Sequence, residues 1–177
     1  MNKHWTLAAA LAVVASLSAC AAELYQAPPP GTHTRWVSPE NPTGAKGAGG
    51  KLNRGAKGMA FIVAKPGETA TLADIQGAGT INRMWLSGTI PRNAEQRRLV
   101  RLEMYWDGAN TPAVAAPIGD FFGVGLGLLV PFESALFSSP EGRSYNVTLP
   151  MPYRKGAKMT VTKLAAHSVP YNKSARS

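Results

Sequence analysis

The chain has one cysteine and three histidines among its 177 residues, and these shortages exclude several kinds of protein. A lone cysteine cannot form a disulfide within the chain, so burial of apolar side chains has to stabilise the domain. No group of His, Cys and carboxylate residues has metal-ligand spacing, and no glycine-rich phosphate motif leads from a strand into a helix. We therefore expect neither a metal site nor another cofactor.

The chain also lacks an apolar run long enough to cross a membrane as a helix. Its one apolar segment near the start, Trp5 to Ser16, follows a short basic region and precedes Leu17-Ser18-Ala19-Cys20. This order is typical of a bacterial lipoprotein leader, which is cleaved before a cysteine that receives a diacylglycerol. We therefore expect residues 1–19 to be a signal peptide and Cys20 to be the lipidation site; a plain secretory peptide is the alternative.

Lipidation of Cys20 predicts an exported protein anchored at the cell envelope, because two or three acyl chains hold a protein stably on a membrane. Ala21, not an aspartate, follows the cysteine, which favours the outer membrane if the host has one. Residues 20–34 contain three consecutive prolines and little apolar material. They are typical of an extended tether.

Acidic residues are scarce, with 10 against 19 basic side chains and a formal net charge of +9. Removal of Lys3 with the leader leaves 18 basic side chains and a charge of +8. The basic residues are scattered through turns and ends and do not alternate with aromatics along one element. This pattern favours a solvated basic surface facing anionic lipid or polysaccharide, and we expect no nucleic-acid partner.

Helical periodicity is nearly absent, and short strand-like segments between Gly and Pro turns take its place. Leu102, Met104 and Trp106 alternate with polar residues, as expected of a half-buried strand. The other expected strands are Met59–Ala64, Thr69–Ile75, Thr80–Ser87, Pro112–Pro117, Arg143–Leu149 and Lys158–Lys163, and Pro91–Arg98 could hold a helical turn. With extended pieces such as Pro150–Tyr153, about eight or nine short strands predict an all-β fold, a single β-sandwich of jelly-roll type over residues 35–163. Residues 164–177 are expected to be a disordered tail.

Five blocks of sequence, in this order and spacing, resemble glycoside hydrolase family 172, earlier catalogued as domain of unknown function family 2961. The blocks are SPENPTGAKGAGG, KPGETATLADIQGAGTINRMWL, YWDG, IGDFFG and LPMPYRKGAKMTV, and they span Trp36 to about Val161. The resemblance implies a jelly-roll scaffold and exo-acting cleavage of furanosides such as α-fructofuranosides or arabinofuranosides. It also implies a furanoside-containing glycan as partner and assembly into trimer-like homo-oligomers.

Members of the family are typically longer, with two jelly rolls and a catalytic glutamate pair in the second. The resemblance therefore implies a truncated or half-length furanosidase-type domain that lacks the catalytic pair. A non-catalytic carbohydrate- or envelope-binding lipoprotein is the alternative, and a structural assembly protein is a third possibility.

Six residues are candidates for binding sugar hydroxyls or stacking on sugar rings: Glu40, Asn41, Trp106, Asp107, Asp120 and Phe121. Each has a structural alternative. Glu40 and Asn41 lie between two prolines and could cap a local turn. Trp106 and Asp107 could be a core-edge aromatic and a hairpin turn. Asp120, the strongest candidate, lies in an expected loop and could cap it over a buried Phe121–Phe122 pair.

Trp85 lies in the middle of an expected central strand, because both sides of that strand are partly apolar. We therefore expect Trp85 in the core.

Overall fold

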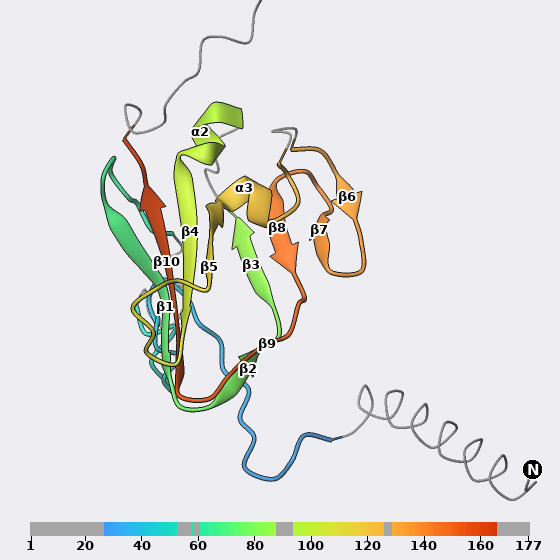
Figure 1. Cartoon of the computed structure of the whole chain (residues 1–177). Coiled ribbons are helices and arrows are strands. Elements are labelled where there is room, and N and C mark those ends of the chain that lie inside the picture. Colours follow the sequence, from blue (N-terminus) through green and yellow to red (C-terminus); the bar gives the residue numbers. More distant parts are fainter. Residues whose placement is uncertain (1–26, 53–57, 59–60, 88–93, 126–128, 166–177) are drawn as a thin grey trace, which may run out of the picture. The chain divides into compact units, whose positions relative to one another are not determined.

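The computed structural model describes residues 27–52, 58, 61–87, 94–125 and 129–165 (Figure 1). The chain separates into two units, Met1–Thr34 and Arg35–Ser177. In the first, the described residues 27–34 are all exposed and form one turn, in which the Thr32 N–H donates to the Pro29 carbonyl. Among the described residues, no helix is long and apolar enough to cross a membrane.

The second unit is built almost wholly from antiparallel strands, which confirms the all-β prediction. In chain order its elements are β1 (Thr69–Gln76), β2 (Gly79–Ile81), β3 (Met84–Ser87), α2 (Ala94–Arg98), β4 (Val100–Trp106), β5 (Val114–Pro117), α3 (Ile118–Phe121), β6 (Phe132–Glu133), β7 (Phe137–Ser139), β8 (Ser144–Val147), β9 (Met151–Tyr153) and β10 (Gly156–Lys163).

Two four-stranded sheets, β1-β10-β4-β5 and β3-β8-β7-β6, are joined by the two-stranded piece β2-β9. Residues 69–87 pair with residues 144–163 as one antiparallel ribbon, whose register shifts by a single residue at two places. The ribbon contributes β1 and β10 to the first sheet, bends at β2-β9, and contributes β3 and β8 to the second (Figure 1). Strands that change sheets in this way are how sandwich corners are made.

One hydrophobic core holds the two sheets together. The first sheet supplies Leu102 and Met104 and the second supplies Tyr145 and Val147, and all four side chains are fully buried. Phe122, which follows α3, joins the same cluster. Because neighbouring residues on each strand point to opposite faces, the alternation around Leu102 directs one face of β4 inward as predicted. The fold is therefore a β-sandwich with a shared core.

The boundaries of several expected elements differ from the structure. Residues 61–64 form no strand, and residues 59–60 of that prediction lie outside the described part. The expected strand Thr80–Ser87 is divided into β2 and β3, because the ribbon bends between Ile81 and Met84. The strands β6 and β7 were not predicted. The expected helical turn in Pro91–Arg98 is present over Ala94–Arg98 as α2, and residues 91–93 of that prediction lie outside the described part.

Candidate functional site

The segment around Asp120 forms a helical turn, α3, where a loop was expected. Pro117 ends β5 and precedes the turn, and the Phe122 N–H donates to the Ile118 carbonyl at 3.3 Å. Gly123 then ends the helix at a φ of 82°, a left-handed conformation that glycine adopts without steric cost. The prediction missed this turn because four residues are too few to show a helical period.

The carboxylate of Asp120 lies against Arg98 of α2. The guanidinium Nη1 is 3.0 Å from Oδ2 and 3.2 Å from Oδ1, and it also reaches the Gly125 carbonyl at 3.5 Å. The Asp120 side chain is 28% exposed and that of Arg98 is 55% exposed. A half-exposed pair of this kind contributes little stability, so its effect is to hold two charged groups in place at the surface.

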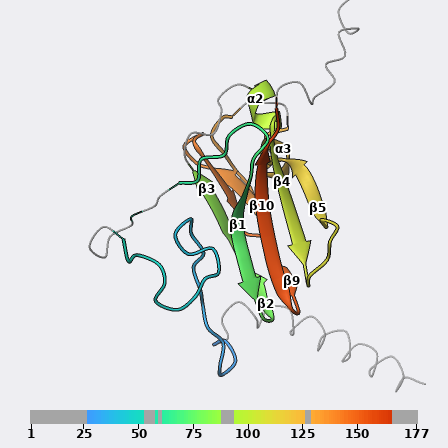
Figure 2. The ribbon, with the colours of Figure 1, turned by 90° about the vertical axis from the view of Figure 1, so that its left-hand side faces the viewer.

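A cavity of about 160 Å³ lies beside this ion pair, between α2 and α3. Ala94, Glu95, Arg97 and Arg98 line it from α2, Gly119 and Asp120 line it from α3, and Val124 and Gly125 complete the wall. Both helices lie at the same end of the sandwich in Figures 1 and 2, and they contact each other and the start of β4. The cavity therefore offers charged donors and acceptors to a small hydroxylated group.

Phe121 packs within the fold rather than lining this cavity. Its ring meets Phe122 edge to face at 4.9 Å and Phe137 at 6.2 Å, and the side chain is partly buried. These are packing contacts of the kind proposed as the alternative for this pair. A sugar-binding role for Phe121 stays a prediction.

Asp107 joins two segments that are far apart in the sequence. Its Oδ1 accepts hydrogen bonds from the backbone N–H groups of Lys155 at 2.6 Å, Arg154 at 2.8 Å and Gly156 at 3.4 Å. The residue has a φ of 58°, which Asp tolerates better than most side chains. Asp107 thus connects the end of β4 to the turn between β9 and β10. The neighbouring Trp106 is half-buried against the core.

We expect the stability of the protein to depend on the charge of Asp107. The N–H of Lys155, followed by that of Arg154, lowers the pKa of this carboxyl below its ordinary value of 3.8. The ionised group therefore stabilises the fold above pH 4, and this contribution is lost as pH falls through the lowered pKa. Asp107→Asn keeps an acceptor and tolerates the left-handed backbone, so it should lower the thermal midpoint at pH 7. The deficit relative to wild type should shrink below about pH 4.

Thermal unfolding of both proteins between pH 2.5 and 7 measures this effect. Asp74→Asn is the matched control, because within the described residues the Asp74 carboxylate accepts a hydrogen bond only from the nearby Gln76 side chain. An Asp107→Asn deficit that does not change with pH would contradict the charge-based account.

Glu40 and Asn41 organise the loop that precedes β1. The Asn41 side chain, 6% exposed, donates to the Ala45 carbonyl at 3.0 Å and accepts from the Ala45 N–H at 3.1 Å. The two oxygens of Glu40 accept the N–H groups of Gly50 and Gly58 at 3.0 and 3.2 Å. The loop meets the sheet where the Asp74 N–H donates to the Pro42 carbonyl at 2.8 Å. These contacts fit the local-capping alternative, and a sugar-binding role stays a prediction.

The structure does not bring the six candidates together. Asp107 follows the last residue of β4, whereas Arg101 near its first residue pairs with Pro117, directly before α3 and Asp120. The length of β4 places the two aspartates about 20 Å apart along the strand direction. The Glu40–Asn41 loop lies beside β1, at the edge of the same sheet.

A second hollow, on the other sheet, was missed by the sequence prediction. It is lined by Trp85, Ser87, Glu141, Arg143 and Ser144 and has a volume of about 510 Å³. Trp85 is 47% exposed, so its expected place in the core was wrong. The reason is that β3 is an edge strand of its sheet rather than a central one. The signal was present in the sequence, since Arg83, Trp85 and Ser87 share one side of the strand and Met84 and Leu86 the other.

In the described part of the chain, no three His, Cys, Asp or Glu side chains come together in a way that could hold a metal ion.

An antiparallel β-sandwich with polar hollows at one end and on one sheet is a scaffold that suits several binding and catalytic functions. A family model described as GH172 domain-like matches residues 56–175, which is more than half of the chain. The protein therefore belongs to the GH172 domain-like family, a glycoside hydrolase-related family, as the resemblance indicated. No curated protein matches the chain.

Proposed function

We propose that this chain supplies a sugar-binding sandwich of furanosidase-type glycoside hydrolysis, on α-fructofuranosides or arabinofuranosides, and does not break the glycosidic bond by itself. Membership of the family supports the glycan as ligand. The observation that carries the second part is that Asp107, Asp120 and Glu103 are engaged in structural contacts.

Glycosidases need two carboxyl groups across the scissile bond, about 5–5.5 Å apart for retention and about 6.5–9.5 Å apart for inversion. Here Asp107 accepts three backbone N–H groups and Asp120 faces Arg98. Glu103 accepts from Tyr105 Oη at 3.0 Å and lies 2.9 Å from Arg101 Nη2. Glu95 and Asp120 both line the cavity between α2 and α3, where Asp120 is held in the ion pair with Arg98, and Glu141 is the one carboxylate among the residues that line the second hollow. In this proposal the catalytic pair belongs to a second jelly roll, as the family resemblance implies.

The cavity beside Asp120 and Arg98 is the proposed contact for sugar hydroxyls. A carboxylate accepts hydrogen bonds from hydroxyl groups and a guanidinium donates to them, and bonds to charged groups are the stronger ones. Because Arg98 already holds Asp120 in place, a hydroxyl that enters the cavity meets a preorganised acceptor.

The full chain, purified in detergent, should release no p-nitrophenol from p-nitrophenyl furanosides above the uncatalysed rate. It should nevertheless bind furanose oligosaccharides in calorimetry, and Asp120→Ala should weaken that binding about tenfold, as expected for one lost hydrogen bond to a charged group. Glu133→Ala is the control, because Glu133 is an exposed carboxylate on β6 outside both hollows. Turnover that Asp120→Asn abolishes would overturn the non-catalytic part of the proposal.

The proposal also places the protein at the cell envelope, held by acyl chains on Cys20. Support comes from the leader pattern, since Cys20 itself lies outside the described residues. An envelope-binding lipoprotein without a sugar ligand remains the alternative. It predicts binding to vesicles of anionic lipid, supported by the net charge, with no response to furanose oligosaccharides.

Assembly into a trimer-like homo-oligomer completes the proposal. Several large apolar side chains are exposed in the described part, among them Phe61 at 65% and Val63 at 73%. Neighbouring exposed apolar residues are typical of surfaces that an assembly covers. Light scattering of the purified chain tests this, and a monodisperse monomer would count against it.

A further inference from the structure

The outer face of the sheet β3-β8-β7-β6 carries one exposed indole in polar surroundings. Trp85 pairs with Asn146 across the β3–β8 ladder, and Ser87 pairs with Ser144, so these four residues lie on the same face. Met84, Tyr145 and Val147 point the other way into the core. The indole therefore belongs to a surface built by two paired strands.

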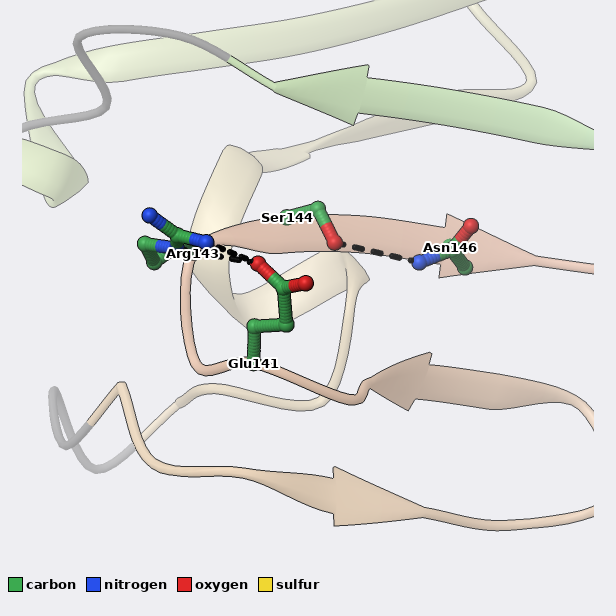
Figure 3. Close-up of polar contacts among 4 residues, drawn as sticks. All are labelled: Glu141, Arg143, Ser144 and Asn146. Carbon is green, nitrogen blue, oxygen red and sulfur yellow. Dashed lines mark hydrogen bonds and ion pairs between the residues drawn. The ribbon is translucent and has the colours of Figure 1, made fainter.

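The polar groups beside Trp85 are held in place by one another. Asn146 is only 8% exposed, and its Oδ1 accepts from Arg83 Nη2 at 3.1 Å. Its Nδ2 donates to Ser144 Oγ at 3.4 Å (Figure 3). The same Nδ2 donates to the Ser138 carbonyl, also at 3.4 Å. A buried amide with several partners fixes the orientation of the hydroxyl and guanidinium groups around it.

The second hollow, called the groove from here on, is lined by Trp85, Ser87, Glu141, Arg143 and Ser144. An ion pair forms its rim at the turn between β7 and β8. The Arg143 guanidinium donates to Glu141 Oε2 through Nε at 3.0 Å and also through Nη2 (Figure 3). Within the described part of the chain, Oε1 of Glu141 accepts no hydrogen bond. Both side chains are about two-thirds exposed or more, so the pair adds little stability and is open to a ligand.

The turn holds this pair in a defined position. Gly142 lies between the two residues with a φ of 62°, and a Cβ there would come within 3.2 Å of the Pro131 side chain. The Gly142 N–H donates to the Ser139 carbonyl at 3.0 Å. The rim is therefore a packed hairpin turn rather than a loose loop.

We propose that this groove is a subsite for one sugar ring of a glycan, stacked on Trp85 and hydrogen-bonded by Arg143, Glu141 and Ser144. The proposal rests on the glycan-binding function above and adds a site for it. A sugar ring has an apolar face of C–H groups and a rim of hydroxyls, which matches one aromatic plane beside fixed donors and acceptors. The volume of about 510 Å³ lies within the range of about 300–1,000 Å³ for small-molecule sites.

A second protein surface fits this groove less well. Protein interfaces bury a core that is depleted in charged residues and enriched in apolar and aromatic ones. Here every lining residue other than Trp85 is a serine or a member of the ion pair. The groove shares no residue with the cavity beside Asp120, so the two sites can be tested separately.

The test titrates the full chain in detergent with arabinofuranose and fructofuranose oligosaccharides, followed by calorimetry and tryptophan fluorescence. Trp85→Ala should weaken binding about tenfold or more, the loss expected for one aromatic contact and its buried area. Trp85→Phe should recover part of the affinity. Trp36→Ala is the matched control, since Trp36 is 69% exposed and lies outside the groove, and it should bind like wild type.

Arg143→Ala tests the groove without altering Trp85 and should also weaken binding. Unchanged affinity in Trp85→Ala and Arg143→Ala, with wild-type binding intact, would overturn the subsite and leave the proposed function standing. Trp85-dependent binding of pyranose oligosaccharides only would support the subsite and overturn the furanoside function. A change of oligomeric state in Trp85→Ala without a change in glycan affinity would overturn the subsite in favour of an interface.

Discussion

Replacing Phe122 by alanine is expected to lower the free energy of unfolding by about 3–5 kcal/mol, the range for removing a large aromatic from a core. The Phe122 side chain is 1% exposed, and its ring stacks on Tyr145 with centroids 5.1 Å apart. It also meets Phe121 edge to face at 4.9 Å. Phe122 lies where α3, β8 and the core come together, so its loss leaves a cavity that several elements would have to close.

Urea unfolding followed by circular dichroism measures this change. Phe61→Ala deletes the same atoms from a side chain that is 65% exposed, and it should cost no more than about 0.5 kcal/mol. Equal losses in the two variants would mean that Phe122 does not anchor the core in solution. A folded Phe122→Ala protein should also bind furanose oligosaccharides more weakly at the cavity between α2 and α3, because Gly119 and Asp120, which line that cavity, precede Phe122 in the chain.

The second large effect is expected from Cys20→Ala, which should move the protein from the membrane fraction to the soluble fraction almost completely. Stable anchoring takes two acyl signals, and the proposed modification of Cys20 carries them all. Fractionation of expressing cells, with metabolic labelling by an alkyne fatty acid, measures both location and acylation.

Ser18→Ala is the control for this experiment, because it changes the leader without removing the thiol. It should keep both the label and the membrane location. A wild-type protein that takes up no label and is released as a soluble exported chain would contradict lipidation and favour the plain secretory peptide.

The sequence predicted the strands best where one face of a strand is apolar and the other polar. Around Leu102 and Met104 the alternation is clear, and both side chains are fully buried. Prediction failed at Trp85, because apolar residues on both sides of its strand were interpreted as a central position, although the side that carries Trp85 also carries the polar Arg83 and Ser87. The tertiary structure shows that β3 is an edge strand, because within its sheet β3 is paired with β8 and with no other strand.

The same limit applies to the candidate site residues. Asp107 is a natural turn residue in sequence, yet its main contacts are to residues 154–156, which no local pattern connects to it. Glu40 likewise accepts a hydrogen bond from the N–H of Gly58, 18 positions away, and no local pattern connects these two residues. The ion pair of Asp120 with Arg98 likewise depends on how α2 and α3 pack.

By itself, the sequence determined the all-β class, through two-residue periodicity and Gly and Pro turns, and the family, through blocks that keep their order and spacing. The tertiary structure decided which carboxylates are engaged and which aromatic is exposed. The physical reason is that backbone periodicity is a local property, whereas hydrogen bonding and burial depend on segments up to about ninety residues apart, as in the β1–β10 pair.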